Sequence, residues 1–176
     1  LKLFLIFTFI FTLGNYSNQF LLLRAKQLGN PLPKVILFYL LYNIVYGLVS
    51  YPAGRLSDRI GRKRLLVTGY LFYGLVYLGF AINNRVDGFW ILFAVYGLYM
   101  GFTEGVEKAF VSDIAPENLR ATTMGLHAML VGVGLLPASL LAGALWKFFG
   151  PSAPFYFGGG MGIISGIGLW FILNGV

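Results

Sequence analysis

The sequence predicts an all-α protein whose helices cross a membrane six times. Of its 176 residues, 58% are hydrophobic and only 11% are charged, whereas an average soluble domain carries about 25% charged residues. The chain contains six apolar runs, each close to the ~20 residues that a helix needs to cross the hydrocarbon core of a bilayer. It also contains 24 glycines and 18% aromatic residues, which is typical of closely packed membrane helices with rings at the interface.

The first three predicted spans cover residues 3–28, 33–54 and 64–82. Polar residues after Gly14 interrupt the first apolar run, and Asn-Pro-Leu-Pro at residues 30–33 separates it from the second. The second run ends in Gly-Arg-Leu-Ser-Asp-Arg-Ile-Gly-Arg-Lys-Arg at residues 54–64, which we name the basic segment. The third run follows this segment directly, so we interpret the segment as a short loop between two membrane helices.

The last three predicted spans cover residues 88–112, 120–147 and 152–174. Each is preceded by residues that favour turns. The last follows Gly150 and Pro151, and this is compatible with a helix start because proline is tolerated in the first turn of a helix. We treat residues 1–176 as a single domain of six transmembrane helices. This number of helices is compatible with two inverted repeats of three helices each.

Charge and cysteine content narrow the classes of function. The chain contains no cysteine, so it holds neither a disulfide nor a metal bound by thiolates. Histidine and aspartate do not cluster in the sequence, so we expect no metal site and no cofactor. The formal net charge is +7, but the basic residues lie between apolar runs. We therefore interpret them as contacts with membrane lipids rather than with nucleic acid.

The distribution of basic residues predicts the orientation in the membrane. Five of the 13 Lys and Arg residues lie in the basic segment, and cytoplasmic loops carry an excess of such residues. Six spans place both termini on the same side of the membrane. We therefore expect the basic segment and both termini to lie in the cytoplasm.

The basic segment resembles the signature loop between the second and third helices of the major facilitator superfamily, a family of membrane transporters. The matching positions are Gly54, Leu56, Asp58, Arg59, Gly61, Arg62 and Lys63. Residues 14–25, 103–120 and 145–155 also resemble this superfamily, and in particular the C-terminal six-helix half of bacterial members. The resemblance implies a six-helix half-bundle in the cytoplasmic membrane of a bacterium.

Each residue type in the basic segment has a physical reason to be there. Gly54 would let two helices approach closely at their ends, and Gly61 would permit a tight turn with positive φ. Asp58 can pair with a neighbouring arginine or cap a helix. The resemblance implies a latch, built on Asp58 and Arg59, that holds the cytoplasmic side closed in one state. The alternative is a segment that only determines topology.

The resemblance implies that the chain is half of a secondary active transporter, which moves a small solute by alternating access, with proton coupling as an option. One six-helix half cannot enclose a cavity that lies between two halves. The chain also opens on Leu1 rather than methionine. We therefore expect a second six-helix half as a partner, either missing from this chain or supplied by a second copy.

Two other classes compete with a transporter. An intramembrane serine protease would need a Gly-x-Ser-Gly site with a partner histidine, but Ser165 lacks the preceding glycine and no motif surrounds His127, so we expect no enzyme. A non-transporting membrane scaffold or receptor that retains the fold is the alternative. We expect measured solute flux to distinguish it from a transporter.

Ionisable residues at membrane depth are functional candidates, because they are costly there. Glu104 lies nine residues before Asp113, about 13 Å along a helix from its end at 1.5 Å per residue. In one reading Glu104 pairs with Lys108 within the helix, while Glu107 bonds to the basic segment. In the other reading Glu104 takes up a proton or contacts a cationic substrate.

Uncharged polar residues within the spans supply further candidates for binding a solute. Asn15, Asn18 and Gln19 interrupt the first span, and polar backbone at membrane depth is tolerated only against protein or a water-filled cavity. They would line the central cavity or hold helices together. Asn43 belongs to a polar stripe on the second span that could face the cavity or the interface. We interpret His127 as a packing residue, with a pH switch as the alternative.

Overall fold

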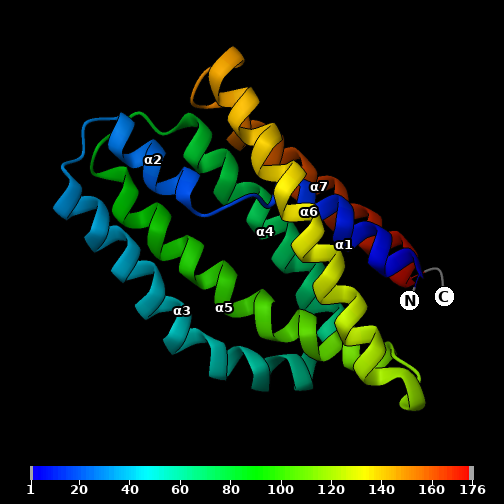
Figure 1. The fold of residues 1–176 in the computed structure, drawn as a ribbon. Helices are drawn as coiled ribbons and strands as arrows, with labels where there is room; N and C mark the ends of the chain where they lie inside the picture. The colour runs from blue at the N-terminus through cyan, green and yellow to red at the C-terminus, as the bar shows by residue number, and fades with distance from the viewer. Residues whose placement is uncertain (1, 175–176) are drawn as a thin grey trace.

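The computed structural model describes residues 2–174, which form seven α-helices and one 3-10 turn (Figure 1). Their bounds are α1 Lys2–Gly14, α2 Gln19–Gln27, α3 Leu32–Ile60, α4 Arg62–Ile82, α5 Gly88–Ile114, η1 Glu117–Leu119, α6 Arg120–Phe149 and α7 Ala153–Asn174. In the described part of the chain no strand is present. The prediction of an all-α membrane fold is confirmed, since α3 to α7 are all long and apolar enough to cross a membrane.

The first predicted span differs from the other five because it is divided into α1 and α2. Residues Asn15 to Asn18 lie between these helices, and asparagine and serine side chains compete with helical backbone hydrogen bonds. Two tyrosine hydroxyls supply partners at this break. Tyr73 of α4 donates to the Gly14 carbonyl at 2.7 Å, and Tyr96 of α5 donates to the Asn18 side-chain oxygen at 2.5 Å. We name residues 15–18 the break.

The basic segment is mostly helical, so the expectation of a loop over residues 54–64 is wrong. Helix α3 continues to Ile60 and α4 begins at Arg62. Only Gly61 separates them, with φ of 94°, which is costly for residues with a Cβ atom. The predicted positive φ at Gly61 is therefore confirmed. Gly54 lies inside α3, and a Cβ atom there would meet no atom within 4 Å, so the predicted close helix approach at Gly54 is wrong.

The helix pairing follows a repeat of three plus three. Helix α3 packs chiefly against α5, and α4 packs chiefly against α7 (Figure 1). In such a repeat, α1 with α2 corresponds to α5, α3 corresponds to α6, and α4 corresponds to α7. The contact between α3 and α5 then has its counterpart in the contact between α6 and α1, which is also present. The contact between α4 and α5 has its counterpart in the contact between α7 and α1. Both halves of the chain therefore use the same packing scheme.

Glycines allow α7 to approach α1 and α4 closely. A Cβ atom on Gly158 would lie 2.7 Å from the Gly14 carbonyl oxygen, and one on Gly159 would lie 3.0 Å from the Gly74 carbonyl oxygen. Gly160 instead faces open space. Close packing is therefore the role of most glycines on this helix, as the sequence predicts. We name the contact of α7 with α1 and α4 the glycine seam.

Arg24 ties α2 to the connection between α4 and α5. Its side chain is buried, with only 3% of its surface exposed. The guanidinium donates to the Gln27 side chain at 2.8 Å and to the Asn83 carbonyl at 3.3 Å. This arginine therefore braces the end of the bundle opposite the basic segment, and does not lie free in the interface.

Candidate functional site

A cleft of about 460 Å³ lies between α1, α5 and α6, and we name it the α1–α5–α6 cleft. Its walls combine apolar side chains such as Phe11, Met100 and Leu135 with several polar ones. The polar lining residues are Thr12, Asn15, Tyr99, Thr103, Glu104, Glu107, Lys108 and His127. Two acidic and two basic side chains therefore face one space between helices that are otherwise strongly apolar, which makes the cleft the candidate solute site.

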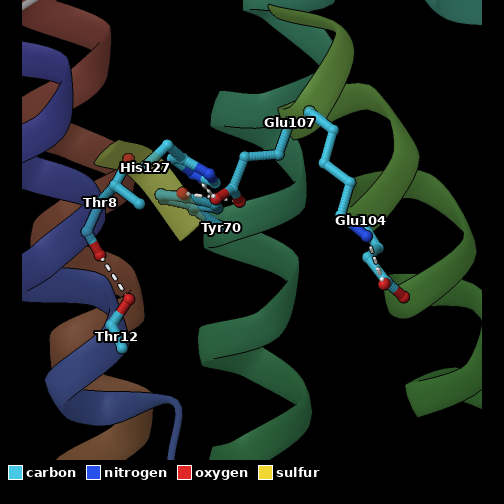
Figure 2. Close-up of polar contacts among 7 residues, drawn as sticks. Thr8, Thr12, Tyr70, Glu104, Glu107 and His127 are labelled. Carbon is cyan, nitrogen blue, oxygen red and sulfur yellow. Dashed lines mark hydrogen bonds and ion pairs between the residues drawn. The ribbon is translucent and has the colours of Figure 1, made fainter. Parts of the chain in front are cut away.

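Glu107 is at the centre of a polar cluster that joins three helices (Figure 2). Its carboxylate accepts a hydrogen bond from the Tyr70 hydroxyl of α4 at 3.0 Å. Its other oxygen lies 2.8 Å from Nε2 of His127 on α6. The side chains of Glu107 and His127 are only 15% and 10% exposed. The expectation that Glu107 bonds to the basic segment is therefore wrong.

Glu104 and Lys108 form the intrahelical pair that their spacing predicts. The Lys108 ammonium lies 2.9 Å from the Glu104 carboxylate. These side chains are 38% and 61% exposed, so both are open to the cleft. Figure 2 shows Glu104 on the same helix as Glu107 and apart from the His127 cluster. Whether Glu104 takes up a proton or contacts substrate stays a prediction.

Helix α1 contributes uncharged polar groups to the cleft. The Thr12 hydroxyl donates to the Thr8 carbonyl at 2.8 Å (Figure 2), so it is satisfied within its own helix. Asn15, the first residue of the break, also lines the cleft. The break therefore places an amide side chain beside the acidic residues of α5.

The other predicted polar residues lie outside the α1–α5–α6 cleft. Asn18 is bonded to Tyr96. Gln19 lines a separate groove of about 560 Å³ between α2 and α3, which also includes Tyr39. The Asn43 amide donates to the Tyr39 carbonyl of its own helix at 2.7 Å. The structure thus brings together Asn15, Glu104, Glu107 and Lys108, but not Asn18, Gln19 or Asn43.

Arg62 organises the basic segment. Its guanidinium lies 3.0 Å from the Asp58 carboxylate on α3 and 2.7 Å from the Asp113 carboxylate on α5. It also donates to the Ala109 carbonyl at 3.1 Å. None of the ion pairs among residues 2–174 includes Arg59 or Lys63. The prediction that Asp58 pairs with a neighbouring arginine is confirmed, with Arg62 as the partner. The latch built on Asp58 and Arg59 stays a prediction.

Comparison with known proteins shows the family. The family model of the Major Facilitator Superfamily matches residues 3–175. The chain belongs to the major facilitator superfamily. It is an integral membrane protein of a transporter family whose members are not enzymes.

Two relatives illustrate how this superfamily chain compares with longer proteins. An uncharacterized MFS-type transporter of Methanocaldococcus jannaschii is 45% identical over 180 residues, which cover 98% of this chain and 44% of that protein. Multidrug resistance protein 2 of Bacillus subtilis is 30% identical over 128 residues, which cover 72% of this chain and 32% of that protein. The chain thus spans less than half the length of these relatives. Because one relative is archaeal, a bacterial membrane stays a prediction.

The superfamily resemblance does not point to Tyr70 or His127 as members of the cleft cluster. Tyr70 lies 37 positions before Glu107, and His127 lies 20 positions after it. A weak signal exists in the sequence, because His127 is the only histidine and lies within an uncharged span. Ionisable groups at such depth usually have a partner, but the sequence does not identify which one.

Proposed function

We propose that this chain forms one half of a secondary active transporter that moves a small solute by alternating access, and that the α1–α5–α6 cleft is its share of the solute site. The observation that carries this proposal is the group of ionisable side chains that face one cleft within apolar helices. Such groups are costly in a membrane, so their presence there marks functional sites and pathways. The proposed partner is a second six-helix half, with which the cleft would form a cavity.

Glu104 is the proposed contact for the solute. Its carboxylate is more exposed than that of Glu107, and its ion pair with Lys108 lies on the surface of the cleft. An acidic group beside apolar and aromatic walls is suited to an organic cation with an apolar body. One relative is named a multidrug resistance protein, which supports including drugs among the solutes tested.

Flux in proteoliposomes tests the proposal. The natural full-length protein is reconstituted, and uptake is measured for a panel of organic cations, sugars, amino acids and organic anions with and without a pH gradient. We expect flux of at least one solute class. Glu104→Gln is expected to reduce that flux tenfold or more, because a hydrogen bond to a charged group contributes about 1.5–3 kcal/mol and about 1.4 kcal/mol corresponds to tenfold.

Glu117→Gln is the matched control, since Glu117 is an exposed carboxylate in η1 outside the cleft. We expect this variant to transport like the natural protein. Equal flux in the Glu104→Gln variant and the natural protein would contradict the role of Glu104. No flux for any solute class, from folded protein, would favour the scaffold or receptor alternative.

A further inference from the structure

Helix α6 is weakly attached to the rest of the bundle. It packs chiefly on α1, with fewer contacts to α7 and α5, and most of its side chains are exposed. Within the part of the chain that the structure describes, one hydrogen bond joins a side chain of α6 to another helix. That bond connects His127 to Glu107 of α5. Beside its packing on α1 and α7, this bond is therefore the polar side-chain contact that ties the described part of α6 to α5.

The roles of donor and acceptor in this contact follow from the atoms involved. An ionised carboxylate can only accept hydrogen bonds, and the Glu107 carboxylate already accepts one from Tyr70. When Glu107 is ionised, Nε2 of His127, 2.8 Å away, carries a hydrogen and donates it. The other ring nitrogen, Nδ1, is the atom that gains or loses a proton when the imidazole changes charge.

The charge of the surroundings leaves Glu107 as the counter-ion for an added proton. Glu104 and Lys108 of α5 compensate each other at 2.9 Å. The remaining titratable side chains nearby are phenols of α3, α4 and α5, which are neutral hydrogen-bonding groups: Tyr46, Tyr70 and Tyr99. The α1 side chains that line the cleft or contact His127 are uncharged. They include the Phe4 ring, which is stacked on the imidazole with centroids 6.5 Å apart. No α7 residue among those described lines the cleft.

We propose that Glu107 and His127 form a proton-binding site that fixes α6 against α5. With the proton on Nδ1, the pair is an imidazolium and a carboxylate with no net charge, and the hydrogen bond is charge-assisted. Such bonds are roughly twice as strong as neutral ones. Without that proton the pair carries one negative charge inside the cleft, and the bond that holds α6 is weaker. Proton release therefore loosens α6 and opens the α1–α5–α6 cleft.

The role of this proton-binding site rests on the proposed transport function, but the experiment that tests the site does not require transport. Spin labels are attached to the natural full-length protein in lipid nanodiscs at Ile60→Cys and Ala121→Cys. Ile60 is exposed at the end of α3, and Ala121 is exposed in the first turn of α6. This chain has no cysteine of its own, so any others in the protein are replaced. Distances between the labels are measured by pulsed electron paramagnetic resonance at pH 5.5 and pH 8.5. These values lie about one unit below and about two units above the usual pKa of histidine.

We expect one narrow distance distribution at pH 5.5 and a broader or longer one at pH 8.5. Glu107→Gln and His127→Gln each keep a hydrogen-bonding side chain but cannot form the ion pair, so both are expected to lose the pH response. Glu117→Gln is the control, because Glu117 is exposed in η1 outside the cleft, and it should keep the response. If one substituted protein fails to fold, the other decides the outcome.

Two results would overturn the inference: distances in the natural protein that do not change with pH, or a change that survives in both substituted proteins. Flux measured on the same preparations separates this outcome from the transport proposal. Flux without a pH response overturns only the proton-binding site. A pH response without flux overturns only the transport function.

Discussion

Arg62 shows that the arginines of the basic segment are not equivalent. A planar guanidinium has five N–H donors in a fixed arrangement, and Arg62 uses them on Asp58 of α3, Asp113 of α5 and the Ala109 carbonyl. Arg59 lies three residues earlier and is exposed. One side chain therefore joins three helices at this end of the bundle, while its neighbour faces outwards.

Replacing each of these arginines in turn tests this difference. Arg62→Gln removes two partly exposed ion pairs and a backbone hydrogen bond, so we expect the free energy of unfolding to fall by about 1–2 kcal/mol. Arg59→Gln should change it by less than about 0.5 kcal/mol. Thermal unfolding of both variants in the same detergent measures the effect. Equal losses of stability would contradict the role assigned to Arg62.

The cleft cluster shows what sequence can and cannot predict about a site. The pair of Glu104 and Lys108 is predictable, because residues four apart on a helix are neighbours. The contacts of Glu107 with Tyr70 and His127 are not, because these residues lie on three helices. From a single sequence, the apolar run around a polar residue predicts how deep that residue lies in the membrane. The sequence does not predict which residue of another helix will contact it.

At the scale of single helices, apolar runs predict the spans well and their ends less well. The predicted second span stops at residue 54, whereas α3 continues to Ile60. Arg55, Asp58 and Arg59 end the apolar run, yet charged residues can continue a helix once it reaches the polar headgroups. The helix ends where backbone conformation changes, at Gly61, and this boundary is independent of hydropathy.

Two glycines of the basic segment give a matched test at this scale. Gly61→Ala places a Cβ atom at φ of 94°, which costs about 1–2 kcal/mol. Gly54→Ala lies inside α3 with open space around it, so we expect it to stabilise by about 0.5–1 kcal/mol. Thermal unfolding compares both with the natural protein. A Gly61→Ala protein as stable as the natural one would show that the turn can adopt another conformation.

At the scale of the whole molecule, the glycine seam makes α1, α4 and α7 a closely packed unit. Carbonyl oxygens of α1 and α4 lie close to the positions that Cβ atoms would occupy on the facing glycines of α7. These helices therefore cannot shift without losing many contacts at once. Helix α6 packs chiefly on α1, where Gly134 lies close to Thr12, and has fewer contacts with α7 and α5. The bundle thus combines a closely packed unit with a helix that is held mainly through α1 on the side of the cleft.

The Gly-Gly-Gly sequence of α7 contains both the test and its control. Gly158→Ala would bring a Cβ atom to 2.7 Å from the Gly14 carbonyl oxygen, and such overpacking costs about 1–3 kcal/mol. Gly160→Ala meets open space and should be neutral or stabilising by up to about 1 kcal/mol. The melting temperatures of the two variants provide the comparison. A lower value for Gly160→Ala than for Gly158→Ala would contradict the seam.

The break between α1 and α2 also determines the order in which the chain can complete its structure during synthesis. Gly14 and Asn18 leave the ribosome well before their hydrogen-bond donors, because Tyr73 and Tyr96 lie 59 and 78 positions later. Until those tyrosines have been made, the Gly14 carbonyl and the Asn18 side chain lack these two hydrogen-bond donors. The break is made before α3 but is therefore completed only once α5 has been made.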